Sequence, residues 1–229
     1  KKGLVLDLDI SSEGLQGTTK FKDKTPYENN GTLSNVTLTT DHKGKANSAG
    51  LFNGTSSYID CGNNSSLDIT DEITISAWIY PKAFVDYNND ASRIICRGHP
   101  SRAYDIYINS GGIIGSWLGG NSYVSSSGVL SLNTWQHIVV TFNSATHNAY
   151  YYLNGVVVAT FTVIATTLPS TNNNFYIGTY DGGITRFFNG SIERPQIWNR
   201  ALSADEVKLL YESYNPNLNI GNYFIDPRD

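Results

Sequence analysis

Methionine and charged residues are scarce in this sequence. Its 229 residues contain no Met, and Asp, Glu, Lys and Arg together make up 16%, against about 25% in a typical soluble domain. Polarity comes instead from 24 Asn, 21 Gly and many Ser and Thr, which are unfavourable inside helices. The composition therefore excludes a mainly helical protein. It is typical of a β-rich, loop-rich chain, which we expect to be extracellular or at the cell surface.

Basic surface patches and long apolar runs are also lacking. The net charge of −4 and the pI of about 5.5 argue against a broad cationic footprint for DNA or RNA. No stretch approaches the roughly 18 consecutive apolar residues of a membrane-spanning helix. We therefore expect neither nucleic acid nor a membrane as a partner. The chain opens with Lys1-Lys2-Gly3 rather than Met, so we expect one module of a larger protein.

Cysteine is limited to two residues, Cys61 and Cys96. They lack the close spacing of a zinc site. They are either paired, as is common outside the cell, or free and buried, and the sequence leaves both possibilities open.

Alternation of apolar and polar residues at period two, interrupted by turn residues, is the dominant pattern. Asn154-Gly155 lies between two such runs and is a strong hairpin signal, because both turn residues need a positive φ. The pattern predicts strands at 4–9, 49–53, 58–61, 73–80, 93–97, 104–109, 113–118, 137–143, 149–153, 156–163, 175–178 and 189–198.

One short helix is predicted near 204–213. Ser203 and Glu206 have the spacing of a capping box, in which each side chain accepts a hydrogen bond from the other residue's backbone N–H. An apolar face follows from Val207 onward.

No linker, repeat or change in composition divides the chain. We therefore predict a single all-β domain over 1–229, built as a two-sheet antiparallel sandwich. Its core is expected at about 3–213, with a C-terminal extension at 214–229.

Several motifs follow one another in order: GLVLDL (3–8), DKTPYENNG (23–31), GK to FNG (44–54), YID (58–60), ITISAWIYP (73–81), TWQHIVVTF (134–142), YYYLNGVVVAT (150–160), FYIGT (175–179) and NGSIERPQIWNRALSADEV (189–207). The last is the most specific. In this order they resemble the laminin G-like domains of the concanavalin A-like lectin/glucanase superfamily, in the form found on secreted bacterial proteins.

The resemblance implies a jelly-roll β-sandwich, often with one structural Ca²⁺ ion. It leaves function open, since one fold hosts many activities. Glucanases of the superfamily carry a Glu-x-Asp-x-x-Glu strand, whose alternate carboxylates act as nucleophile and acid. This sequence has no such triplet. Gln136 and His137 lie in a segment that is structural in the family, so we expect no catalytic activity.

A calcium site is expected at the loop 23–31. Ca²⁺ prefers six to eight oxygen ligands, and Asp23, Asn29 and Glu193 match acidic and amide positions of the family pattern. Lys24 and Pro26 depart from the small residues that the family has there. The alternative is an Asx-type turn without an ion.

Trp117 is the leading candidate for a ligand contact. It lies among glycines (GSWLGG, 115–120) that leave a ring accessible, and an accessible ring packs against the C–H face of a sugar. Trp78, Trp135 and Trp198 fall where the family also has large aromatics, so we expect them to serve packing.

Arginines and further aromatic residues complete the predicted ligand-binding set. Arg97 and Arg102 lie in a basic stretch that suits a uronate or sulfated polymer, the alternative being a solvated hairpin with internal ion pairs. Tyr107 alternates with apolar neighbours and so lies on the opposite face of its strand. Tyr180 and Phe187 belong to a loop that we expect at the rim of the site.

These features predict a non-catalytic, extracellular module that binds a polysaccharide or another glycan. A structural or adhesive domain of a surface or viral fibre protein, contacting protein, is the first alternative. An unrecognised polysaccharide lyase or glycoside hydrolase is the second. The sequence names neither the sugar nor the oligomeric state.

Overall fold

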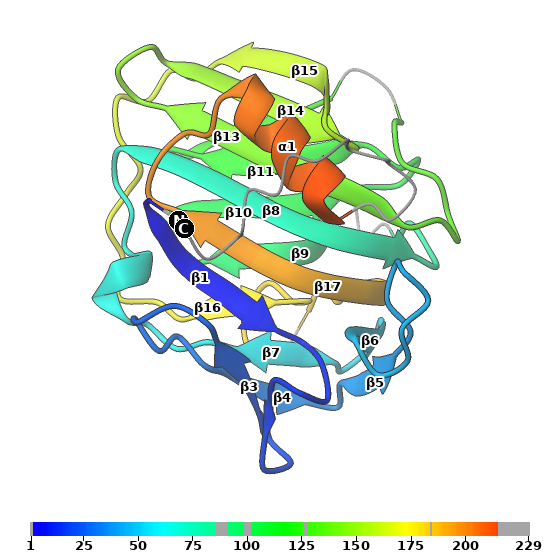
Figure 1. Cartoon of the computed structure of the whole chain (residues 1–229). Coiled ribbons are helices and arrows are strands. Elements are labelled where there is room, and N and C mark those ends of the chain that lie inside the picture. Colours follow the sequence, from blue (N-terminus) through cyan, green and yellow to red (C-terminus); the bar gives the residue numbers. More distant parts are fainter. Residues whose placement is uncertain (1, 86–90, 99–101, 126–127, 184, 215–229) are drawn as a thin grey trace.

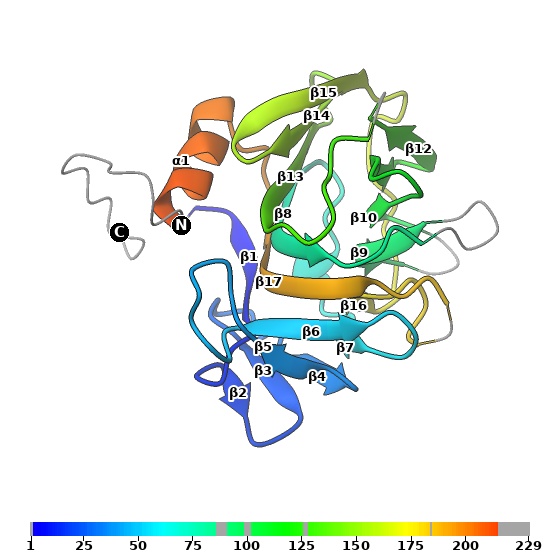
Figure 2. The ribbon, with the colours of Figure 1, turned by 90° about the vertical axis from the view of Figure 1, so that its right-hand side faces the viewer.

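Two antiparallel β-sheets pack face to face in the computed structural model, which describes residues 2–85, 91–98, 102–125, 128–183 and 185–214 (Figures 1 and 2). One helix lies against the outside of one of them. We call the sheet beneath the helix the front sheet and the other the back sheet. The expected extension at 214–229 falls outside the described residues, apart from Tyr214.

The front sheet runs from one edge to the other in the order β5 (Thr37–Thr39), β6 (Ala49–Asn53), β17 (Asn189–Trp198), β8 (Glu72–Pro81), β13 (Gln136–Asn143), β14 (Asn148–Leu153) and β15 (Val156–Thr162). β1 (Leu4–Asp9) pairs with the second half of β17, whose first half pairs with β6. The first and the last strands of the chain are therefore neighbours.

The back sheet has the order β2 (Leu15–Gln16), β3 (Lys20–Asp23), β4 (Gly31–Ser34), β7 (Tyr58–Asp60), β16 (Phe175–Ile177), β9 (Ser92–Arg97), β10 (Tyr104–Ile108), β11 (Ile114–Leu118) and β12 (Asn121–Val124). β3 also pairs with the end of β1, which links the two sheets at one edge. A 3-10 turn, η1 (Ser65–Leu67), follows β7.

Period-two alternation places one side of each sheet in a common apolar core. On β13, Ile138 and Val140 point between the sheets, whereas Val139 points outward. Ile95 and Ile106 meet them from the back sheet. Burial of this core is the main favourable contribution to folding.

The predicted helix is confirmed as α1 (Ala204–Tyr214). Its capping box is formed: Ser203 N donates to Glu206 Oε2 at 2.9 Å, and Glu206 N donates to Ser203 Oγ at 3.3 Å. Val207 is fully buried against the outer face of the front sheet, in a second small cluster that includes Trp198. Among the described residues, no helix has the length and apolarity needed to cross a membrane.

Each predicted strand is present, and the Asn154-Gly155 turn has the expected positive φ values of 51° and 79°. Five short strands, β2 to β5 and β12, were not predicted. Each has only two to four residues. The three-residue strands β7 and β16 were nevertheless predicted, because aromatic and β-branched residues mark them.

Both cysteines are free and buried, which decides between the two possibilities left open by the sequence. Burial raises the pKa of the Cys61 and Cys96 thiols, so neither is a reactive thiolate at neutral pH.

Candidate functional site

The outer face of the back sheet carries a row of polar and aromatic side chains that crosses six strands. Residues paired in antiparallel strands point to the same side, and the alternate residues, such as Ile95 and Ile106, lie in the core. The row is about 24 Å long at the usual strand spacing. It consists of Asp60, Tyr176, Cys96, Asp105, Trp117 and Ser122.

An arginine–aromatic cluster surrounds the middle of this row. It consists of Arg93, Arg102, Arg186, Tyr107, Trp117 and Tyr180. The three guanidinium carbons lie 5.1, 4.7 and 4.0 Å from the centre of the Tyr180 ring, for Arg93, Arg102 and Arg186 in turn. Each distance is within the range of a cation–π contact.

Arg102 connects two of the aromatic rings. Its guanidinium lies 4.2 Å from the centre of the Trp117 ring, and its Nε donates to Tyr180 Oη at 2.8 Å. Trp117 and Arg102 are both partly exposed, whereas Tyr180 is buried. Solvent therefore reaches the arginine and the indole on the same face.

Asp105 lies beneath the cluster and fixes it. Its fully buried carboxylate accepts hydrogen bonds from Arg93 Nε at 3.0 Å and from Trp117 N at 2.6 Å. Burial raises the pKa of Asp105, and the Arg93 and Arg102 guanidiniums oppose that rise. One buried carboxylate thus holds both an arginine and the backbone of the exposed tryptophan.

The loop after β16 supplies Tyr180 and Arg186. It is closed by the Asp181 carboxylate, which accepts from Thr185 N at 2.9 Å. Arg93 N donates to Arg186 O at 3.0 Å, which docks the loop on β9. On β11, a Cβ at Gly115 would lie 2.1 Å from the Tyr107 ring, so glycine is what lets this ring lie flat across the strand.

A hollow of about 260 Å³ lies beside Tyr176, near the Asp60 end of the row. It is lined by Asn172, Asn173, Asn174, Tyr176 and Asp181. Amide and carboxylate groups beside a tyrosine ring are the groups that read sugar hydroxyls. The hollow therefore extends the polar and aromatic character of the row.

The structure brings together four of the six predicted ligand-binding residues: Trp117, Tyr107, Arg102 and Tyr180. Trp117 belongs to β11 and not to an open glycine loop.

Arg97 and Phe187, the other two predicted ligand-binding residues, are both buried. Arg97 is one residue beyond Cys96 and so points to the opposite side, where it is 1% exposed and donates to Thr171 O at 3.1 Å. Phe187 is 5% exposed, about as buried as Tyr180 and Tyr107 at 6% and 7%, and its role as a ligand contact stays a prediction.

Arg93, Arg186 and Asp105 were not in the predicted set. Arg93 reaches the outer side because the register shifts between Ile106 and Tyr107 on β10, a bulge-like irregularity. The sequence carries no signal for that shift, nor for the return of the 180–187 loop to β9.

The other tryptophans lie on the outer face of the front sheet. Trp78 and Trp198 are 5% and 3% exposed, as expected for packing residues. Trp135 is partly exposed, with its ring centre 5.7 Å from that of Tyr80. His42 stacks on Trp78 at 3.9 Å between ring centres.

Gln136 and His137 have structural surroundings. Gln136 is buried and exchanges two hydrogen bonds with the backbone of Ser131, of 3.0 and 2.8 Å. His137 is 1% exposed beneath α1, and burial lowers its pKa to about 3. It is therefore a neutral imidazole at physiological pH.

The three predicted calcium ligands do not converge. Asn29 N donates to Asp23 at 3.0 Å, but the Glu193 carboxylate lies on the front sheet and pairs with His42 at 2.7 Å. Among the described residues no group of three or more His, Cys, Asp or Glu is placed to hold a metal ion.

Asp23 is already saturated by its own loop. Its two carboxylate oxygens accept four hydrogen bonds of 2.7 to 3.0 Å, from Asp7 N, Thr25 N, Thr25 Oγ1 and Asn29 N. A carboxylate has about four lone-pair positions, so none is left for a cation. The residues as arranged do not fit calcium, and calcium binding stays an untested prediction.

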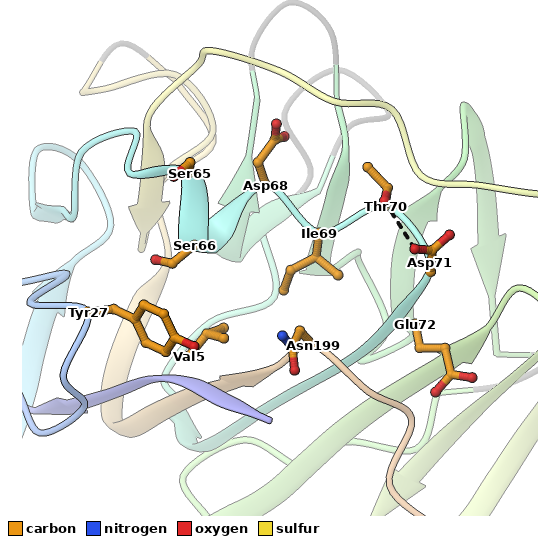
Figure 3. A pocket seen from close by; sticks show the side chains of 10 residues that line it. All are labelled: Val5, Tyr27, Ser65, Ser66, Asp68, Ile69, Thr70, Asp71, Glu72 and Asn199. Carbon is orange, nitrogen blue, oxygen red and sulfur yellow. Dashed lines mark hydrogen bonds between the residues drawn. The ribbon is translucent and has the colours of Figure 1, made fainter. Parts of the chain in front are cut away.

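A second hollow, of about 280 Å³, lies at one end of the sandwich between β1, η1 and the start of β8 (Figure 3). Its carboxylates serve the chain itself. Asp68 accepts from Thr171 N at 2.9 Å, and Glu72 accepts from Asn143 Nδ2 at 2.7 Å. We therefore regard this hollow as a junction between segments.

A sequence profile of the concanavalin A-like lectin/glucanases superfamily matches residues 53–208. The chain belongs to this superfamily. A search of curated protein sequences found no match.

Solved structures share the fold at low identity. Domain 4 of AbnA, a GH43 extracellular arabinanase from Geobacillus stearothermophilus in complex with arabinotriose, aligns with a TM-score of 0.68 and 18% identity. The alignment covers 91% of this chain and 98% of that domain. The binding domain of Paraclostridial Mosquitocidal Protein 1 aligns with a TM-score of 0.70 and 20% identity, over 93% of this chain and 52% of that one.

A sialidase of Trypanosoma rangeli, in complex with 2,3-difluorosialic acid, aligns with a TM-score of 0.65 and 16% identity, over 91% of this chain and 32% of the enzyme. The chain thus spans about half of the toxin binding domain, 52%, and a third of the sialidase, 32%. At these identities the likeness shows the fold alone.

Proposed function

We propose that this chain is a non-catalytic, extracellular carbohydrate-binding module, and that a glycan lies across the outer face of the back sheet. The observation that carries the proposal is the grouping of Trp117, Arg102, Tyr107 and Tyr180 on that face. Arg102, Tyr107 and Trp117 lie within 16 residues of one another around the β10–β11 hairpin, and the fold adds Tyr180 from 63 residues further along the chain.

The chemistry of this face suits a sugar. The exposed part of the Trp117 indole offers an apolar surface to the C–H side of a sugar ring, while guanidinium and amide groups donate to its hydroxyls. Asp105 holds the backbone of Trp117, and Gly115 leaves room for the Tyr107 ring, so little conformational entropy is lost when a ligand binds.

The structural neighbours support the same ligand class. The arabinanase domain, which this chain matches over 98% of its length, is described in complex with arabinotriose. Another neighbour is a structure of botulinum neurotoxin type C, a toxin whose cell entry is described as dependent on interaction with two ganglioside molecules. Both descriptions belong to those proteins, and they favour a glycan over a protein partner for this one.

Two tryptophan variants test the proposal. Trp117→Ala should weaken binding to the glycans that the full chain recognises on an array by about 1 to 3 kcal/mol, the range for losing one aromatic contact at a binding site. Trp135→Ala removes an equally sized, partly exposed ring from the front sheet and should leave binding unchanged. Equal loss in both variants, or no glycan bound by the wild type, would reject the proposal.

A further inference from the structure

Three arginines gather around the Tyr180 ring at the back sheet, although the chain as a whole is acidic. The protein has a formal net charge of −4, yet three guanidiniums lie within 5.1 Å of the Tyr180 ring centre. Like charges held this close repel one another, and the repulsion is strongest where water is excluded. The Asp105 carboxylate offsets part of this repulsion at Arg93, and an anion beside Arg102 would offset more of it.

Arg102 is the guanidinium best placed to meet that anion. Arg93 is paired with the Asp105 carboxylate at 3.0 Å. Arg102, in contrast, makes no ion pair with any described residue, and its one hydrogen bond there runs from Nε to Tyr180 Oη. It is also partly exposed, so a ligand can reach it.

The orientation of Arg102 is fixed before any ligand arrives. Three contacts hold its guanidinium in place: the ring centres of Trp117 and Tyr180 lie 4.2 and 4.7 Å from its central carbon, and its Nε donates to Tyr180 Oη at 2.8 Å. A planar guanidinium with free terminal N–H groups matches the two oxygens of a carboxylate or of a sulfate ester. The neighbouring indole then contacts the sugar ring that carries the anionic group.

We propose that the glycan bound on this face is anionic, with a carboxylate or a sulfate ester accepting from Arg102 beside Trp117. The inference rests on the proposed glycan-binding function and adds the charge of the ligand. It also assigns separate roles to the two residues: Trp117 contacts the sugar ring, and Arg102 reads its charge.

Paired polymers test the role of charge. Binding of the full chain is measured with polygalacturonate and with carboxyl-reduced polygalacturonate, and in a second arm with dextran sulfate and with dextran. We expect at least tenfold tighter binding to the charged member of one pair, and the arm that responds tells carboxylate from sulfate. Added salt should weaken this preference.

Three variants assign the preference to Arg102. Arg102→Gln should weaken binding to the charged polymer about tenfold or more, and Arg102→Lys should fall between, because it keeps the charge and loses the planar fork. Lys208→Gln makes the same change of charge on the exposed side of α1 and should change binding less than twofold. Melting temperatures close to that of the wild type show that each variant is folded.

The outcomes separate the inference from the function. Binding of neutral glycans that depends on Trp117 but not on Arg102 would overturn the inference and leave the proposed function standing. Equal weakening by Lys208→Gln would mean unspecific attraction and would also overturn it. If no polymer of either pair and no glycan on an array is bound, both the inference and the proposed function fail.

Discussion

The two outer faces of the sandwich use the same residue types in opposite ways. On the front sheet, α1 lies over the outer face (Figure 1), and Trp198 packs there with Val207 of the helix, at 3% and 0% exposed. The outer face of the back sheet lies on the side away from α1 (Figure 2), and Trp117 is covered in part by a guanidinium. The helix makes the outer face of the front sheet a second small core. The arginine on the back sheet, by contrast, leaves Trp117 in contact with water.

This difference teaches how to interpret tryptophan in a β-sandwich. Both Trp198 and Trp117 occupy a strand, so the local sequence pattern of each is similar. What differs is the covering group, which comes from elsewhere in the chain. An apolar covering group excludes water and stabilises the fold, while a charged covering group keeps the ring accessible and preserves it for a ligand.

The sharpest way to break this comparison is to remove one ring from each face. Trp198→Ala should lower the free energy of unfolding by about 3 to 5 kcal/mol, because a buried ring leaves a cavity. Trp117→Ala should lower it by less than about 1.5 kcal/mol, as expected for a partly exposed side chain. Urea unfolding of both variants measures the difference. If both lose equally, the back face is a second core and not a binding surface.

A comparable loss is expected at the edge where the two sheets meet. Asp23→Ala leaves three backbone N–H donors, those of Asp7, Thr25 and Asn29, without an acceptor, while Thr25 Oγ1 can still donate to Val5 O at 3.3 Å. The cost is about 2 to 4 kcal/mol, since unmet buried donors are expensive. Because the lone pairs of Asp23 are filled, the melting temperature of the wild type should be the same in EDTA and in millimolar calcium.

The same measurement also tests the expectation that Asp23 binds no calcium. A higher melting temperature in calcium, lost in Asp23→Ala, would show that the ion displaces the present donors. The donor saturation of Asp23 would then be a property of the ion-free chain only.

The sequence predicted the fold well because local signals agree with the tertiary structure. Asn154-Gly155 needs a positive φ in any context, and the capping box of Ser203 and Glu206 closes within one helical turn. Strands of five or more residues show their alternation. β5 has three residues and carries little strand signal of its own, whereas β7 and β16 are equally short but were predicted from their aromatic and β-branched residues.

The site was predicted only in part, for a physical reason. Tyr107 was placed correctly by alternation, but Arg97 was misplaced because side chains change face at every residue. Arg93 reaches the outer face through a register shift, and Arg186 through a loop that returns to β9. Neither event is encoded within a few residues, so tertiary contacts alone decide them.

Low pH should reduce the free energy of unfolding through His137, which lies beneath α1 on the front sheet. Its pKa is lowered to about 3 by burial, against roughly 6.5 in the unfolded chain. Between these values the unfolded state binds one more proton, so stability falls as pH falls, by up to about 1.4 kcal/mol per pH unit. Urea unfolding from pH 7 to 5 should show this slope, and His137→Gln should flatten it. An unchanged slope in the variant would mean that another group is responsible.

The smallest expected effect concerns the cap of α1. Ser203→Ala removes the acceptor of Glu206 N and should lower the free energy of unfolding by about 1 kcal/mol, the usual cost of losing an N-cap. The change loosens the helix that covers the front sheet without touching either sheet, so glycan binding on the back sheet should be unaffected. Urea unfolding and glycan binding of the same variant give both values. A loss of binding would show that the two faces are coupled, and the contrast between a structural face and a binding face would then have to be abandoned.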